Sequence, residues 1–426
     1  MRFPAPAVIA ALLLVLPASA ADWPCFRGPN HDGISGETGI STSWPKDGPP
    51  VVWSRNVGRA FSSFAIVDRR LFTCGEQDGQ QVLICLNADD GEVQWKRRLE
   101  PAMTDPDENL YGTRATPTVD EGRVFILGGH AGLFCRDVRT GEQLWSRTFS
   151  NRPHWGYSGS VLIEGDLAIV SAGGSDGSLL AMDKRTGKTV WTCGDDPAGY
   201  ATPQPFDFDG RRYVCGFMAQ SVIIAEAATG KLALRQEWQS HSGVNVSTPI
   251  FHEGQLLVTT GYGYGSGLFR LRRDEEVLAA DEVWKSTKLR CKFQTPILLG
   301  GALYASDENA LKCVDFKTGR VLWRKGGIRN GSLLCADGLL LLLTETGELQ
   351  IAKPSPEGFD PLATVKLFEG SKYNLFTRKQ GRRCWTAPVF CNGRLYIRDH
   401  DTVVCLDLAC RASEGSTAGA EPDEHR

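Results

Sequence analysis

Short apolar runs alternate with turn residues along most of the chain, and one unit of this pattern recurs. In the clear copies a strand-length run ends in Asp or Asn, a Gly follows four residues later, and a Trp follows that Gly by another four. The copies are Asn87, Gly91, Trp95; Asp137, Gly141, Trp145; Asp183, Gly187, Trp191; Asp315, Gly319, Trp323; and a weaker one, Glu226, Gly230, Leu234. Self-similarity of this kind predicts a repeat architecture.

The recurring unit has the chemistry of a tight turn between two strands. An acidic or Asn side chain at a strand end can accept hydrogen bonds from nearby backbone N–H groups, and Gly supplies the positive φ of the turn. We expect the Trp on the following strand to pack between neighbouring sheets. Truncation of such a buried Trp would cost about 3–5 kcal/mol.

A second segment alternates with the first and has the pattern of a hairpin. It begins with Thr-Pro or a substitute, reaches a turn about five residues later, and continues as an apolar strand. Its copies start at Phe64, Pro117, Ser160, Pro203, Pro249, Pro296, Leu333 and Pro388. Most starts lie 43 to 47 residues apart. That period, with two hairpins and therefore four strands per repeat, is typical of a propeller blade.

Eight starts predict an all-β fold, an eight-bladed β-propeller of four-stranded antiparallel blades. The copy from Pro388 ends near Asp407 without an outer strand, while a strand around Trp53 precedes the first blade. We expect this N-terminal strand to complete the last blade, because closure removes a sheet edge that would invite pairing. The predicted domains are a coil segment over 21–48, the propeller over 49–408 and a disordered C-terminal tail over 409–426.

Residues 1–20 have the pattern of a signal peptide. Arg2 gives a positive start, Val8 to Leu16 form a short apolar stretch, and Ala18-Ser19-Ala20 offers a cleavage site. The apolar stretch is too short for a comfortable membrane span, and no later apolar run is longer. We therefore predict an exported protein, periplasmic or secreted, without a transmembrane segment.

The net charge and the cysteine positions reduce the number of possible functions further. The formal net charge is -3 and no long basic run occurs, so a nucleic-acid partner has no electrostatic support. The 13 cysteines are odd in number and contain no C-x-x-C spacing. Four of them, Cys85, Cys135, Cys313 and Cys405, share one repeat position, which predicts small buried side chains. Whether any cysteines form disulfides stays open.

The repeats Asp183-Lys-Arg-Thr-Gly-Lys-Thr-Val-Trp191 and Asp315-Phe-Lys-Thr-Gly-Arg-Val-Leu-Trp323 resemble quinoprotein-type propeller repeats. The stretch Asp22-Trp-Pro-Cys-Phe-Arg-Gly-Pro-Asn30 resembles the leader of exported bacterial proteins in that superfamily. The resemblance covers nearly the whole chain after the leader. It implies the propeller fold, in a superfamily that holds both pyrrolo-quinoline quinone dehydrogenases and non-catalytic propellers such as the outer-membrane assembly factor.

Resemblance to the dehydrogenases implies a quinone stacked on a disulfide of adjacent cysteines, a calcium ion and an Asp base. This chain has no Cys-Cys pair, and its most evident Asp residues occupy turns. The glycine-rich run Gly261 to Gly267 follows a strand, but no helix pattern follows it, so a phosphate-binding loop lacks its context. We predict no catalytic residues, no metal site and no cofactor. The alternative is an oxidoreductase that uses pyrrolo-quinoline quinone and Ca²⁺ to oxidise alcohols or sugars.

The loops that enter the innermost strands should line the mouth of the central channel. Aromatic and cationic residues gather in these loops, which suits an anionic or planar ligand or an extended peptide. The candidate binding residues are Arg59, Phe61, Arg114, His154, Trp155, Tyr157, Tyr200, Asn245, Phe293, Arg329, Asn330, Arg383 and Trp385. The competing interpretation is that these aromatic residues only fill the axis and pack between blades.

These patterns favour an exported, monomeric, non-catalytic scaffold that binds a protein or another macromolecule through its channel-mouth face. Besides the quinone-dependent oxidoreductase, a carbohydrate-binding propeller that uses the rim aromatics is a further alternative. Neither the partner nor a substrate can be named from the residues.

Overall fold

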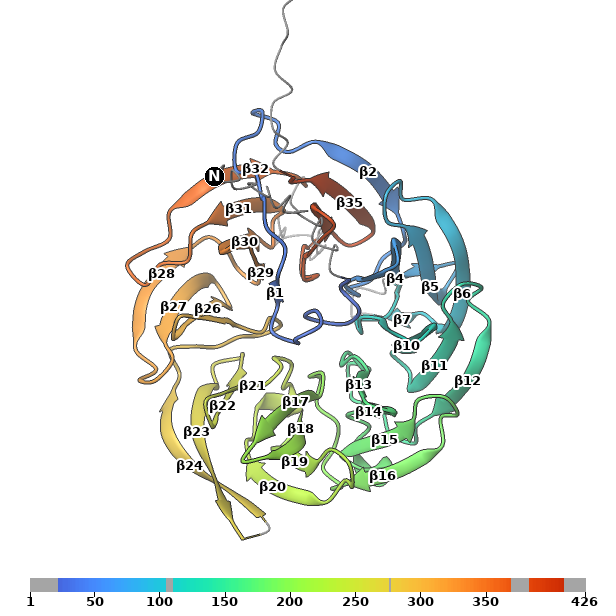
Figure 1. The fold of residues 1–426 in the computed structure, drawn as a ribbon, viewed down its shortest axis with the longest axis vertical. Coiled ribbons are helices and arrows are strands. Elements are labelled where there is room, and N and C mark those ends of the chain that lie inside the picture. The colour runs from blue at the N-terminus through green and yellow to red at the C-terminus, as the bar shows by residue number, and fades with distance from the viewer. Residues whose placement is uncertain (1–21, 105–109, 276, 369–382, 410–426) are drawn as a thin grey trace, which may run out of the picture.

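Eight blades of four antiparallel strands each surround a central axis in the computed structural model, which describes residues 22–104, 110–275, 277–368 and 383–409 (Figure 1). The sheet of one blade has an additional, parallel strand. This arrangement confirms the predicted all-β, eight-bladed propeller. The predicted signal peptide, and all but the first residue of the predicted C-terminal tail, lie outside the described residues. None of the described helices is long and apolar enough to cross a membrane.

In the first four blades the strands run outward from the axis in chain order. Blade 1 contains β3 (Ala65–Val67), β4 (Arg70–Gln77), β5 (Gln80–Asn87) and β6 (Val93–Pro101); blade 2 contains β9 (Thr118–Asp120), β10 (Arg123–Leu127), β11 (Gly132–Asp137) and β12 (Gln143–Thr148). Blade 3 contains β13 (Leu162–Glu164), β14 (Leu167–Val170), β15 (Leu179–Asp183) and β16 (Thr189–Cys193); blade 4 contains β17 (Gln204–Phe208), β18 (Arg211–Phe217), β19 (Ser221–Glu226) and β20 (Leu232–Glu237).

The next three blades follow the same order. Blade 5 contains β21 (Ile250–His252), β22 (Gln255–Thr260), β23 (Gly265–Asp274) and β24 (Val277–Ser286); blade 6 contains β25 (Ile297–Leu299), β26 (Ala302–Asp307), β27 (Ala310–Asp315) and β28 (Val321–Gly326). Blade 7 contains β29 (Ser332–Ala336), β30 (Leu339–Leu343), β31 (Glu348–Ala352) and β32 (Pro361–Lys366). A two-stranded ribbon of β7 (Met103–Thr104) and β8 (Leu110–Tyr111) lies between blades 1 and 2 in the chain.

Blade 8 joins the two ends of the propeller. It contains β33 (Val389–Cys391), β34 (Arg394–Arg398) and β35 (Thr402–Asp407), and its outer strand is β2 (Val51–Asn56) from the other end of the chain. Trp53 of β2 is paired with Cys405 of β35. The predicted closure by an N-terminal strand is therefore confirmed.

In six blades a Trp of the outer strand connects the blade to the next one. The indole Nε1 of Trp191 in blade 3 donates to the carbonyl of Ala227 in blade 4 at 3.1 Å. Gly230 of the same turn faces the ring so closely that an added Cβ would lie 2.6 Å from it. Equivalent bonds run from Trp53, Trp95, Trp145, Trp284 and Trp323 to carbonyls of the following blade. The expectation that Trp packs between sheets is confirmed.

Hydroxyl residues just before the inner strands link the blades around the axis. Thr116 accepts the backbone N–H of Ser63 at 3.3 Å, and Ser160 accepts that of Thr116 at 2.9 Å. Thr202 in turn accepts from Ser160, and Thr295 accepts from Thr248, both at 2.9 Å. The recurrent Thr of the Thr-Pro segments therefore links neighbouring blades through these hydrogen bonds.

The hydrophobic core is distributed as clusters between neighbouring blades, for example between blades 1, 2 and 3 and between blades 6 and 7. The cysteines of the shared repeat position lie inside these clusters, as the repeat predicted. Burial raises the pKa of Cys85, Cys135 and Cys405 to about 12. All described cysteines are free and buried, so these thiols act as small apolar side chains.

Candidate functional site

The segment over 22–40 crosses the axis on one face of the ring and touches several blades (Figure 1). Trp23 pairs with Ile66 of blade 1, and the strand β1 (Ile34–Ser35) adds in parallel to β29 of blade 7. Glu37 accepts the backbone N–H groups of Asn392 and Gly393 at 2.6 and 2.8 Å in blade 8. No strand was predicted here, because β1 is too short to show an alternating pattern of apolar and polar residues.

Arg27 fixes this segment over the channel. Its guanidinium is buried and donates to the carbonyls of Thr295 and Pro296 in blade 6 at 3.2 and 3.0 Å. Burial lowers the pKa of Arg27 to about 10, which still leaves the group charged at neutral pH. The neighbouring Phe26 side chain lines the channel, so the segment closes one end of it.

A cavity of about 390 Å³ occupies the axis above Phe26. Its walls are the residues at the start of the inner strands, and its mouth is formed by the loops that enter those strands. Eight of the predicted binding residues line it: Arg59, Phe61, Arg114, Trp155, Tyr200, Phe293, Arg383 and Trp385. The structure thus brings these eight side chains together around one cavity, and their role in binding stays a prediction.

The cationic side chains of the lining lie on one side of the cavity, whereas aromatic side chains surround it. Arg59, Arg114 and Arg383 lie in the loops that enter blades 1, 2 and 8, which are neighbours in the ring. Aromatic residues come from the same loops, namely Phe61, Tyr111 and Trp385, and from the loops of blades 3 to 6, namely Trp155, Tyr200, Tyr262 and Phe293. No carboxylate belongs to the described residues of the lining. The cavity thus suits a ligand with an anionic end and an apolar or aromatic body.

The remaining five predicted residues do not belong to the cavity lining. Tyr157 is buried, and its hydroxyl donates to the carbonyls of Asn151 and Ala172 at 2.8 and 2.6 Å. Asn245 is buried too and donates to the carbonyl of Met218 at 2.8 Å. Both sit in the expected loops, but each loop turns its polar side chain inward to satisfy backbone carbonyls.

The other three predicted residues contact side chains in or next to the cavity wall; they are His154, Arg329 and Asn330. His154 packs edge-on against Trp155 with ring centroids 4.8 Å apart. Asn330 donates to Glu345 at 2.8 Å, and Arg329 forms an ion pair with the same carboxylate at 3.8 Å.

Glu345 holds a wall of the cavity in place. Its carboxylate accepts the indole N–H of Trp385 at 3.0 Å. Burial alone would raise the pKa of Glu345, but the hydrogen bonds from Trp385 and Asn330 outweigh it and the pKa is lowered. The charged carboxylate therefore orients the Trp385 ring, which contacts Phe61 and Phe293 at centroid distances of 5.2 and 4.6 Å.

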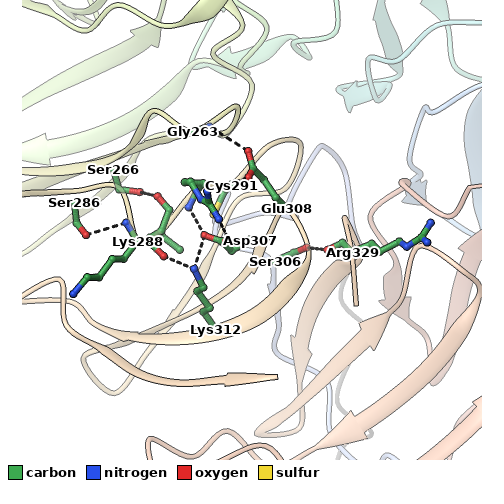
Figure 2. A network of polar contacts seen from close by, with 12 residues as sticks. Gly263, Ser266, Ser286, Lys288, Cys291, Ser306, Asp307, Glu308, Lys312 and Arg329 are labelled. Atoms are coloured by element: carbon green, nitrogen blue, oxygen red, sulfur yellow. Dashed lines mark hydrogen bonds and ion pairs between the residues drawn. The ribbon is translucent and has the colours of Figure 1, made fainter. Parts of the chain in front are cut away.

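A polar network between blades 5 and 6 supports the part of the cavity wall that contains Tyr262 (Figure 2). Asp307 accepts the backbone N–H of Arg290 at 2.6 Å and pairs with Lys312 at 3.0 Å. The adjacent Glu308 accepts the backbone N–H of Gly263 at 3.3 Å. The network thereby fixes the loop that carries Tyr262, whose ring also lies 4.5 Å from the ammonium group of Lys292.

Residues that the sequence analysis missed complete the site. They include Phe26, Tyr111, Tyr262 and His400. Tyr262 belongs to the glycine-rich run that the sequence marked as a loop, so position in a repeat could have found it. Phe26 and His400 carry no repeat signal, because one comes from the N-terminal segment and the other from the turn between β34 and β35.

The cavity does not match the needs of a calcium–quinone centre. The described lining offers guanidinium groups and aromatic faces but no carboxylate, whereas Ca²⁺ prefers carboxylate and carbonyl oxygens. Within the described residues, no cluster of three or more His, Cys, Asp or Glu side chains could hold a metal ion. We therefore derive no redox step at this site.

A closed eight-bladed ring with Trp-anchored repeats and an axial cavity defines the class of quinoprotein-like repeat propellers. The sequence profile of the family described as "Outer membrane protein assembly factor BamB" matches residues 47–127 and 79–325. The chain belongs to this family.

Individual relatives agree with this assignment. The outer membrane protein assembly factor BamB of Shewanella oneidensis is 23% identical over 328 residues, which cover 69% of this chain and 76% of that protein. The crystal structure of BamB from Moraxella catarrhalis superposes with a TM-score of 0.59 at 16% identity and covers 86% of this chain and 99% of that one. The quinohemoprotein alcohol dehydrogenase of Comamonas testosteroni gives a TM-score of 0.64 at 14% identity, with 94% and 82% covered. These structural likenesses concern the fold.

Proposed function

We propose that the protein is an exported, non-catalytic propeller scaffold that binds a protein or another macromolecule through its channel-mouth face. The observation that carries the proposal is the axial cavity, which combines three arginines with a wall of aromatic rings. Arginine and aromatic residues are the types that dominate binding energy at protein interfaces. Membership in a family described as an outer membrane protein assembly factor supports a protein partner and an exported location.

The rim offers side chains that a partner can reach. Trp155 and Tyr262 each expose 41% of their surface at the mouth of the cavity. Exposed aromatic side chains in a concave site are typical anchors for a partner, because they bury a large area at a small entropic cost. A partner bound here would cover both rings.

The test is capture of a partner from the exported fraction by the tagged protein, compared with a Trp155→Ala/Tyr262→Ala double variant. We expect the double variant to retain at most about a tenth of the captured partner, because two interface anchors together are worth more than about 1.4 kcal/mol. The matched control is Leu144→Ala/Val190→Ala, which removes two exposed side chains from outer strands. Equal capture by wild type and double variant would contradict the proposal.

A quinone-dependent oxidoreductase is the second candidate, because the aromatic faces and guanidinium groups suit a planar carboxylated ring even without a calcium donor set. Purified protein would be mixed with pyrrolo-quinoline quinone and Ca²⁺, and dye reduction measured with alcohols and sugars. Absence of quinone binding by absorbance at micromolar cofactor removes this candidate. A glycan array tests the carbohydrate-binding alternative, and absence of binding to the array removes it.

A further inference from the structure

His400 is a buried cavity residue with an unsatisfied nitrogen. Its side chain is only 6% exposed, and its Nε2 has no hydrogen-bond partner among the described residues. Leaving a buried polar atom unpaired costs about 1–3 kcal/mol, so such atoms usually meet a water, an ion or a ligand. Because His400 lines the axial cavity, a ligand in that cavity can reach it.

The charges around His400 favour an anion. Arg59 and Arg383 also line the cavity, and both act on the imidazole strongly enough to lower its pKa. Arg398, which donates to the backbone carbonyl of His400 at 3.3 Å, also lowers the pKa of the imidazole, whereas Asp401 raises it. Burial is the largest cause, and together these groups lower the pKa of His400 to about 3. At neutral pH the ring is therefore neutral and can donate one N–H beside two cationic groups.

An apolar surface adjoins this corner of the cavity. Phe61 contacts the His400 ring edge-on with centroids 5.4 Å apart, and it also contacts Trp385. Trp385 in turn contacts Phe293. A group with an aromatic body could lie along these three rings while its charged end reaches His400.

We infer that Arg59, Arg383 and His400 form a carboxylate subsite, which takes an acidic residue placed next to an aromatic residue in an extended segment of the partner polypeptide. The inference rests on the proposed function, since it names the chemistry of the partner at the same face. The carboxylate accepts from the two guanidinium groups and from the imidazole N–H, and the aromatic neighbour stacks on the wall of Phe61 and Trp385.

The test titrates the full-length protein with matched peptides and follows tryptophan fluorescence. The probe is acetyl-Phe-Glu-Phe-amide, and its neutral partner is acetyl-Phe-Gln-Phe-amide. We expect the Glu peptide to bind at least about tenfold more tightly, the usual margin for a charge-assisted contact. Free phenylacetate serves as a third probe, and binding as tight as that of the peptide would show that the subsite takes small acids rather than a chain.

Variants locate the effect. Arg383→Gln and His400→Asn should each remove the preference for Glu over Gln, while Arg383→Lys should keep part of it. The matched controls are Arg272→Gln and His252→Asn, which change residues of blade 5 outside the cavity lining, on the outer hairpin and at the end of β21. Thermal unfolding of each variant identifies any that fail to fold. A Glu preference that survives in folded Arg383→Gln and His400→Asn would overturn the inference.

A second readout is the pKa of His400, followed by NMR of ring-labelled histidine. A bound carboxylate stabilises the protonated ring, so its pKa should rise with the Glu peptide and stay constant with the Gln peptide. A purely structural His400 would not respond. If partner capture is lost in the Trp155 and Tyr262 variant but unchanged in His400→Asn and Arg383→Gln, the scaffold function stands and the carboxylate subsite is wrong.

Discussion

Buried charged groups hold parts of the ring together that are far apart in the chain. Arg398 of blade 8 is fully buried, and its guanidinium donates to the carbonyls of Ser62 and Cys74 in or next to blade 1 at 3.2 and 2.7 Å. It also donates to the carbonyl of Gly58 at 2.6 Å. Burial lowers the pKa of Arg398 to about 10, so the group stays charged at neutral pH. One side chain therefore joins the last blade to the first.

Replacing Arg398 with Leu should destabilise the protein by at least about 3 kcal/mol, because several buried carbonyls lose charge-assisted hydrogen bonds. Urea unfolding followed by circular dichroism measures the change. Arg324→Leu, at an exposed position of blade 6, is the control and should stay within about 0.5 kcal/mol of wild type. A loss at Arg398 no larger than the control loss would mean that the carbonyls are satisfied by water instead.

The contacts of the Asp196 carboxylate predict how the free energy of unfolding depends on pH. Its buried carboxylate accepts two bonds from Arg235 at 2.8 and 2.7 Å and one from Ser221 at 2.8 Å. The hydrogen bond from Arg235 is the main cause that lowers the pKa of Asp196 below its ordinary 3.8. A lowered pKa in the folded state adds stability above the unfolded pKa, and this contribution disappears as pH falls through the folded pKa.

The advantage of wild type over Asp196→Asn in the free energy of unfolding should therefore be constant above about pH 5 and shrink below about pH 4. Urea midpoints measured between pH 7 and pH 3 test this dependence. The exposed Asp166 offers a matched Asp166→Asn control, for which we expect little change with pH. An advantage that grows on acidification would contradict the assigned sign.

At the level of elements, the repeat made most strands predictable because each hairpin carries its own turn chemistry. Asp183 accepts from Thr186 at the predicted turn, and hydrogen bonds from this Thr lower the pKa of the Asp. Blade 3 shows the limit of this reasoning. The sequence aligned Ser160 with Pro117, whereas the bonds between blades align Ser160 with Thr116. The one-residue error arose because the glycine comes first in the turn of blade 3 and second in that of blade 2.

The candidate site was harder to predict than the strands. Residues in loops that enter the inner strands could be located by counting back from each repeat, and the predicted set contained eight of the lining residues. Side-chain direction inside a loop has no period, so Tyr157 and Asn245 were placed at the rim although they point inward. Contributions from outside the repeat, such as Phe26, depend on how a distant segment crosses the axis.

The contact of Trp191 with blade 4 predicts how much stability is lost when this side chain is removed. Trp191 packs against Gly230 and donates to Ala227 of the next blade, so Trp191→Ala should cost about 3–5 kcal/mol of stability. Trp155→Ala at the exposed rim is the control and should cost less than about 1 kcal/mol. Chemical denaturation measures the free energy of unfolding of both variants. Equal losses of stability in Trp191→Ala and Trp155→Ala would show that the Trp191 contact does not join the blades.

At the level of the whole molecule, stability depends on contacts between neighbours arranged in a circle. The hydrophobic clusters each join two or three adjacent blades, and the largest of them spans the closure, from Trp53 and Ile66 to Leu349 and Val403. In a closed ring each blade is supported from both sides, whereas an open ring leaves two blades with one neighbour only. The strand β2 therefore affects the unfolding of every blade, not only that of blade 8.

Two deletions distinguish the effect of the closing strand β2 from the effect of the segment that covers one end of the channel. A protein that lacks 22–48 loses the segment with Phe26 and Arg27 but keeps β2, so we expect a folded ring with a lower melting temperature and an open channel floor. A protein that lacks 22–56 also loses β2 and exposes the edge of β35, which should abolish cooperative unfolding and promote association through that edge. Calorimetry and size-exclusion chromatography compare the two. Because both proteins lack the same covering segment, a cooperative and monomeric product of the longer deletion would show that the ring does not need its N-terminal strand.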